Sequence, residues 1–146
     1  MIREATPDDI EDVIKLGLAF FAEAHTDLTP KFSKEKAVAV IQGMIKSDGC
    51  LLYVAERDDK IVGMIGAIIS EAWFSSEMTA QEMFWYVLPN YRSGVGIALL
   101  TALEGRAKKI GVSLIAMVDL GDKSPVDALL ERRGYCVHEK TYVRRL

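Results

Sequence analysis

Apolar positions recur every three or four residues in the first third of the chain, a spacing that is typical of helices with one buried face. The first set comprises Ile10, Val13, Ile14, Leu18 and Phe21, and the second comprises Val38, Ile41 and Ile45. The break "DLTP" separates the two sets. The pattern therefore predicts a short strand near the N-terminus and then two helices, the second of which is capped by Ser33.

The middle of the chain changes to shorter apolar runs that are typical of strands. Two such runs in "LLYVAERDDKIVGMIGAII" flank a polar turn, which predicts a hairpin. Gly63 and Gly66 in the second run permit a close backbone approach or a bulge. After the loop "SEAWFSSEMT" a third strand is expected over residues 81–88.

The second half of the chain returns to helical spacing. A helix is expected over residues 96–110, with Leu99, Leu100, Leu103 and Ala107 facing inward. A buried strand should follow over residues 113–120, then a short helix that ends at Gly134, and residues 136–146 should supply one or two closing strands. This order mixes a hairpin with at least one right-handed strand–helix–strand crossover, so it predicts one α/β domain, residues 1–146, with helices on both faces of its sheet.

Composition narrows the functional classes. The formal net charge of −3 lacks the basic excess of a nucleic-acid-binding protein, and no apolar run approaches the length that spans a membrane. Only two cysteines are present, Cys50 and Cys136, without metal-ligand spacing, so no metal site is predicted. A reducing cytoplasm is the natural expectation for such a chain.

The segment "YVLPNYRSGVGIALL" passes from strand to helix through two glycines. The first N–H groups of a helix have no partner within it, and the helix dipole makes this end partly positive. Gly94 and Gly96 keep side chains away from those groups, while Arg92 and Ser93 could add contacts to an anion. The segment therefore indicates a phosphate site, although an ordinary glycine-containing loop would look the same.

Other known phosphate-binding loops share features with this segment. A Walker loop is excluded because no lysine follows the glycines. The dinucleotide fingerprint G-x-G-x-x-G fits only in part, since Leu99 stands at its third glycine and Pro89 interrupts the junction with the strand. It remains a weak alternative.

Three pieces of the chain, in their order and spacing, carry a resemblance to a known family. They are "YVAERDDKIVGMI", "YVLPNYRSGVGIALLTALEGRAKKIGV" and "ALLERRGY". Together they resemble the GCN5-related N-acetyltransferase (GNAT) superfamily over nearly the whole chain. The resemblance implies a mixed, mostly antiparallel sheet of six to seven strands, and acetyl-CoA as the co-substrate that donates an acetyl group to an amine.

The resemblance also implies where acetyl-CoA would lie. Pantetheine would occupy a gap between the strand that ends at Val87 and the strand near residues 113–118. The residues implied in cofactor binding are Tyr86, Val87 and Leu88 for pantetheine, Arg92, Ser93, Gly94, Val95, Gly96, Ile97 and Ala98 for the pyrophosphate, and Ser124 as a nearby hydroxyl.

Glu82 is the candidate general base, because many relatives place a glutamate at this interval before the end of the cofactor strand. Strand alternation is expected to put Glu82, Phe84 and Tyr86 on one face, where burial would raise the carboxyl pKa. Tyr86 could orient the base or the substrate. A salt-bridged or exposed glutamate and simple packing of the tyrosine stay open as alternatives.

The acceptor amine is not identified by the sequence. Trp73 and Phe74 are candidates to line its pocket, and Glu71 and Glu77 would favour a cationic amine, but anchoring of the loop explains the aromatic pair equally well. Dimers are frequent among similar proteins, so a homodimer stays open.

Two departures from the family pattern support a second hypothesis. Arg92 stands one residue too close to the glycines, so the phosphate loop is one residue short, and Leu130 occupies the position where many relatives carry an acid-catalytic tyrosine. The alternative is therefore a protein of the same fold that binds CoA, or another partner, without efficient catalysis.

Overall fold

The computed structural model describes residues 1–24, 26–119 and 125–146. Its strands are β1 (Ile2–Glu4), β2 (Cys50–Arg57), β3 (Lys60–Glu71), β4 (Met78–Val87) and β5 (Leu114–Ala116). Its helices are α1 (Ile10–Ala24), α2 (Lys34–Lys46), α3 (Arg92–Lys109) and α4 (Pro125–Arg132). Short 3-10 turns, Pro7–Asp9 and Pro89–Tyr91, lead into α1 and α3.

The strands lie in one sheet in chain order, β1 to β5. Neighbours from β1 to β4 are antiparallel, whereas β4 and β5 are parallel and joined through α3, as predicted for a mixed sheet with one crossover. The β2–β3 hairpin turns at Asp58 and Asp59, which both have positive φ (50° and 59°), the geometry of a tight two-residue hairpin turn.

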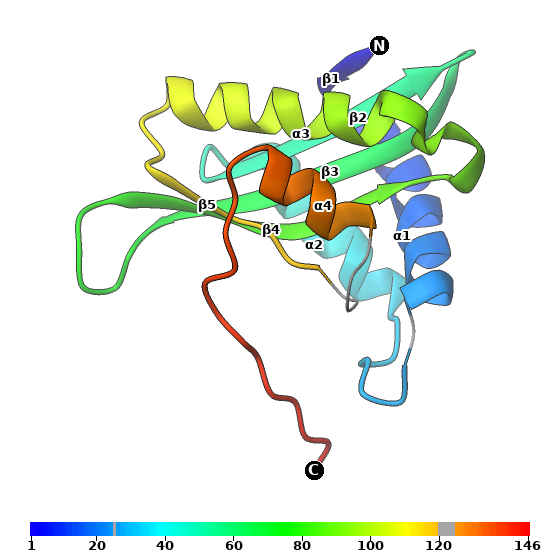
Figure 1. Ribbon diagram of the computed structural model, residues 1–146. Helices are drawn as coiled ribbons and strands as arrows, with labels where there is room; N and C mark the ends of the chain where they lie inside the picture. Colours follow the sequence, from blue (N-terminus) through cyan, green and yellow to red (C-terminus); the bar gives the residue numbers. More distant parts are fainter. Residues whose placement is uncertain (25, 120–124) are drawn as a thin grey trace.

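The predicted number of six to seven strands is wrong, because the sheet of the described residues has five. Residues 136–146 form no strand, and Val137 and Tyr142 in this segment are 89% and 83% exposed. Residues with high strand propensity form a strand only when they can pair with a neighbouring strand and pack one face against other side chains. The last strand, β5, is only three residues long and partly exposed, so it offers little ladder for a further strand. The end of the chain instead extends away from the sheet (Figure 1).

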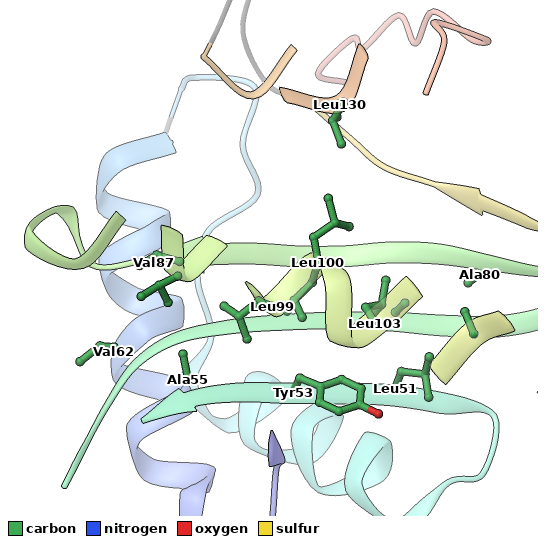
Figure 2. Packing of buried hydrophobic residues seen from close by; sticks show 14 residues of the cluster. Leu51, Tyr53, Ala55, Val62, Ala80, Val87, Leu99, Leu100, Leu103 and Leu130 are labelled. Atoms are coloured by element: carbon green, nitrogen blue, oxygen red, sulfur yellow. The ribbon is translucent and has the colours of Figure 1, made fainter. Parts of the chain in front are cut away.

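Helices cover both faces of the sheet, as predicted (Figure 1). On one face α3 inserts Leu99, Leu100 and Leu103, each with 0% exposure, and α4 adds Leu130, whose side chain points toward Leu100 (Figure 2). The other face carries α1 and α2, which pack on Leu52, Val54, Met64 and Tyr86 of the sheet. Alternate residues of the strands therefore serve two separate cores.

A bulge in β4 changes which side chains share a face. Gly66 pairs with Phe84 and Ala67 pairs with Glu82, so Met83 is the extra residue between them. Directly paired residues point to the same face, and Ala67 belongs to the α3 side of the sheet whereas Phe84 belongs to the α1 side. The prediction that Glu82, Phe84 and Tyr86 share one face is therefore wrong.

Gly66 makes the crossing of Phe84 over β3 possible. A Cβ at Gly66 would stand 2.6 Å from the Phe84 ring and 3.0 Å from the Met44 methyl group. We expect Gly66→Ala to lower the free energy of unfolding by about 1–3 kcal/mol in urea denaturation, because the ring would have to leave its place.

Gly105→Ala is the matched control, since no atom of the part of the chain that the structure describes lies within 4 Å of its added Cβ in α3. This variant should gain up to about 1 kcal/mol, because alanine is the better helix former. If Gly66→Ala is as stable as the wild type, Phe84 does not pack on Gly66.

Candidate active site

The strands β4 and β5 part beyond a short ladder. Within the described residues, β4 pairs with β5 only between residues 79–81 and 114–116. Beyond this ladder the N–H of Val118 donates to the carboxylate of Glu82 at 2.8 Å instead of to a strand carbonyl. The rest of β4, up to Val87, therefore has an edge that β5 does not cover, as expected for a strand that receives an extended ligand.

Glu82 lies at the point where the two strands part. Glu82 is 8% exposed, and its carboxylate accepts a hydrogen bond from the Val118 N–H. Burial raises the pKa of Glu82 to about 7, although the Val118 N–H acts in the opposite direction by favouring the ionised form. The predicted elevation of this pKa is confirmed, and the cause is the one that was expected.

The backbone between β4 and the continuous part of α3 departs from helical geometry. Ser93 and Gly94 have non-helical torsions, with φ of +81° at Gly94, so the continuous helix begins after Gly94. Such a φ favours glycine, and none of the described residues lies within 4 Å of an added Cβ there. Gly96 lies in the first turn, where a Cβ would stand 3.4 Å from the Trp85 indole. First-turn N–H groups have no acceptor inside the helix, which leaves them for an anion.

Arg92 folds back onto the end of β4. Its Nε donates to the Val87 carbonyl at 3.0 Å, and its Nη2 donates to both carboxylate oxygens of Glu23 at 2.8 and 2.6 Å. The Tyr86 hydroxyl donates to the same carboxylate at 3.1 Å. Hydrogen bonds from Arg92 and Tyr86 lower the pKa of Glu23 against a smaller opposing effect of burial.

Sequence reasoning missed Glu23 because it lies far away in the chain, near the end of α1. One signal was present. A carboxylate in the last turn of a helix opposes the helix dipole, and α1 has no basic residue in its last turn to compensate it. A distant cation was therefore needed, and Arg92 supplies it.

A sequence model of the acetyltransferase (GNAT) family matches residues 18–135. The chain belongs to the acetyltransferase (GNAT) family. The family and the acyltransferase class predicted from the sequence are thereby confirmed. No curated protein matches the chain.

Solved structures of acetyltransferases share this fold. The chain is similar to AAC(6')-Iy in complex with the bisubstrate analogue CoA-S-monomethyl-acetylneamine, with 18% identity, 100% of this chain and 97% of the other covered, and a TM-score of 0.81. It is also similar to a predicted acetyltransferase with acetyl-CoA from Clostridium acetobutylicum, with 13% identity, coverage of 97% and 93%, and a TM-score of 0.80. A ribosomal-protein-alanine N-acetyltransferase from Brucella melitensis has 19% identity, coverage of 100% and 99%, and a TM-score of 0.71.

This GNAT acetyltransferase brings some of the predicted site residues together and separates others. Arg92, the glycines and the end of β4 form one continuous junction. Tyr86 faces α1, on the side of the sheet opposite to Glu82, so its side chain does not contact the candidate base. Ser124 lies outside the described residues.

Trp73 and Phe74 lie in the loop between β3 and β4, at the end of β4 opposite to the junction with α3. Their rings meet edge to face with centroids 5.1 Å apart, and they are 93% and 75% exposed. The structure therefore does not bring this pair together with Glu82.

Residues 1–24, 26–119 and 125–146 contain no cluster of three side chains suited to a metal ion. No helix in these ranges is long and apolar enough to cross a membrane.

Proposed function

We propose that this GNAT acetyltransferase passes the acetyl group of acetyl-CoA directly to a primary amine of a small molecule or a protein. The observation that carries the proposal is the buried carboxyl of Glu82, with its pKa raised to about 7, where β4 and β5 part. A carboxyl that titrates near neutral pH is suited to take a proton from an amine.

The open edge of β4 and the glycine junction fit the two parts of acetyl-CoA. Backbone groups of Tyr86 and Val87 would hold pantetheine along the edge that β5 leaves uncovered, whereas the expected contribution of Leu88 is corrected, because its N–H donates to the Val62 carbonyl and its carbonyl accepts from the Tyr91 N–H. Amides between Arg92 and Ala98 would bind the pyrophosphate, where Gly94 with φ of +81° turns the chain into the first turn of α3. Ser93 and Ser124 would add hydroxyl contacts.

Glu82 would act on the acceptor amine. As the amine nitrogen forms its bond to the acetyl carbon, its proton passes to the Glu82 carboxylate, and the bond between the acetyl carbon and sulfur breaks. A backbone N–H on the open edge of β4 would stabilise the negative charge on the acetyl oxygen. The electron pair of the broken bond leaves with sulfur as a CoA thiolate.

Leu130 takes no part in the departure of the thiolate. The residue is 8% exposed and packs in the core under α4, and its side chain has no proton to give. A thiol has a pKa of about 8.5, so a thiolate can leave near neutral pH without a proton donor. Solvent then protonates the sulfur.

The acceptor class is open between small molecules and proteins. Similar structures include aminoglycoside 6'-N-acetyltransferases and a ribosomal-protein-alanine N-acetyltransferase. The exposed pair of Trp73 and Phe74 could contact a large acceptor, with Glu71 nearby to attract a cationic one.

The free thiols Cys50 and Cys136 support a reducing, cytoplasmic setting.

Two measurements test the function. Isothermal titration should show binding of acetyl-CoA, and release of free thiol from acetyl-CoA should accelerate in the presence of at least one member of a panel of amines and peptides. Binding without acceleration would favour the protein that binds CoA without efficient catalysis, which the buried Leu130 already supports. Absence of binding to any CoA ester would overturn the proposal.

A further inference from the structure

Arg92 already has partners for its guanidinium without any phosphate. It donates to the Val87 carbonyl through Nε and to both oxygens of Glu23 through Nη2. Its guanidinium carbon also lies 5.5 Å from the centre of the Tyr86 ring. The side chain therefore connects the end of β4 to α1, and it cannot contact a phosphate at α3 with the same nitrogens.

The ion pair between Arg92 and Glu23 can be replaced by an ion pair between Arg92 and a phosphate at little cost. Both side chains are 47% exposed, and exposed ion pairs contribute little because water competes for both charges. A diphosphate offers more negative charge than one carboxylate, and the first turn of α3 adds backbone donors beside it. Arg92 lies two residues before Gly94. Rotation of the Arg92 side chain can therefore bring the guanidinium close to the first continuous turn of α3, which follows Gly94.

Glu23 would keep its place after such an exchange. The Tyr86 hydroxyl donates to Oε2 of Glu23 at 3.1 Å, and Tyr86 is 7% exposed in the core beside α1. Loss of Arg92 would leave this carboxylate half exposed, held by a buried residue and without its cation. Such a group binds an ammonium ion by a charge-assisted hydrogen bond.

We propose that Arg92 leaves Glu23 for the diphosphate when acetyl-CoA binds, and that Glu23 then binds a second cationic nitrogen of the acceptor. This inference rests on the proposed function. The exchange makes binding of the donor and of a cationic acceptor mutually favourable.

The position of Glu23 indicates the class of acceptor. Tyr86, which contacts Glu23, follows Glu82 by four residues of β4, one of which is the bulge residue Met83, so the interval corresponds to about 10 Å along the strand, and the two side chains point to opposite faces of the sheet. Glu23 is therefore too far from Glu82 to bind the nitrogen that is acetylated there. The structure assigns the site to an acceptor with at least two amino groups separated by several bonds.

The first test measures acetyl-CoA affinity by isothermal titration without acceptor. Glu23→Gln should bind acetyl-CoA about two- to five-fold more tightly than the wild type, because Arg92 no longer has to leave a carboxylate. Arg92→Gln should bind about tenfold more weakly, and adding Glu23→Gln to it should restore nothing. Glu11→Gln is the matched control, since it removes the same charge from the exposed other end of α1 and should leave affinity unchanged.

The second test measures binding of spermidine, a probe with three amino groups, in the presence and absence of CoA. In the wild type CoA should tighten spermidine binding by the same factor by which spermidine tightens CoA binding, because the coupling is reciprocal. The effect should vanish in Glu23→Gln and be absent for butylamine, which has one nitrogen.

The outcomes distinguish a failure of the proposed Arg92 exchange from a failure of the proposed acetyltransferase function. If Glu23→Gln binds acetyl-CoA with unchanged or weaker affinity, the exchange is wrong while the transferase proposal stands. If CoA still promotes spermidine binding in Glu23→Gln, or never does so in the wild type, Glu23 is not the acceptor group. If the wild type binds no acetyl-CoA, both proposals fall.

Discussion

Glu82→Gln should lower kcat/KM for acetyl transfer by about 100-fold or more near neutral pH, the usual contribution of a positioned general base. Glutamine has nearly the shape of glutamate and keeps an oxygen that can accept the Val118 N–H. The variant therefore removes proton transfer and little else. Affinity for acetyl-CoA, measured by isothermal titration, should stay within about twofold of the wild-type value, because no cofactor contact is assigned to this carboxyl.

The pH dependence identifies the titrating group. Wild-type kcat/KM should rise with pH through the range around 7, because burial raises the pKa of Glu82 to about 7 and only its carboxylate accepts a proton. The variant should lack this limb. Its activity should instead rise about tenfold per pH unit at higher pH, as the acceptor amine loses its own proton with a pKa of about 10.

Glu139→Gln is the control for the loss of one negative charge, since Glu139 lies in the exposed C-terminal segment and has no role in the proposed site. It should retain the activity and pH profile of the wild type. An unchanged rate in Glu82→Gln would remove Glu82 from the mechanism and leave the fold untouched. A rate loss with an intact limb around pH 7 would assign the limb to another group.

Local patterns predicted most of the fold. Helical spacing in α1, α2 and α3 and the polar turn between β2 and β3 are properties of short segments, and the structure has these elements close to the expected places. The strand count depended on pairing between distant segments, and the end of the chain has residues suited to a strand but no ladder to join. Propensity alone could not reveal that difference.

The site was predictable where it depends on neighbours in the sequence. Gly94 and Gly96 mark the junction into α3, and the positive φ at Gly94 is the geometry that a glycine there suggests. The contact of Arg92 with Glu23 joins residues far apart in the chain, so the acidic last turn of α1 indicated that a cation was needed but not which one. The same limit applies to the side of the sheet on which Glu82 lies.

The bulge at Met83 has a functional consequence. Unbroken alternation would have left Glu82 on the face of α1, with Tyr86 and its hydroxyl. One extra residue turns Glu82 to the face of α3, where its carboxyl meets the Val118 N–H at the place where β5 leaves β4. Bulges re-aim side chains in this manner next to active sites. Gly66 allows it, because Phe84 then crosses directly over that position.

Glu82→Gln should also make the protein more stable in mildly alkaline solution. Burial raises the pKa of Glu82 from 4.5 to about 7 in the folded protein, so ionisation of this group opposes folding. The difference corresponds to about 3 kcal/mol at pH values above the folded pKa. Glutamine does not ionise, so the variant should avoid this loss in urea denaturation at about pH 8.

Ionisation of Glu82 lowers the free energy of unfolding because the folded protein binds this proton more tightly than the unfolded chain does. Between pH values of 4.5 and about 7 the folded protein holds a proton on Glu82 that the unfolded chain has released. The favourable contribution of this proton is complete below the unfolded pKa and is lost as pH rises through the folded one. Asp9 stays ionised over the same range, because hydrogen bonds from Arg3 and Thr6 outweigh burial and lower its pKa to about 2. Asp9 therefore adds no slope to the comparison.

The gain in stability should thus be near zero at about pH 4.5 and should grow until about pH 7–8. Glu139→Gln, a change in the exposed C-terminal segment, should alter the free energy of unfolding by no more than about 0.5 kcal/mol. If Glu82→Gln gives a flat difference, the carboxyl titrates in the fold as it does in water, and the physical reason for assigning it as a base disappears. A stabilised but slow variant would instead show that the chain keeps an unfavourable buried acid for the sake of catalysis.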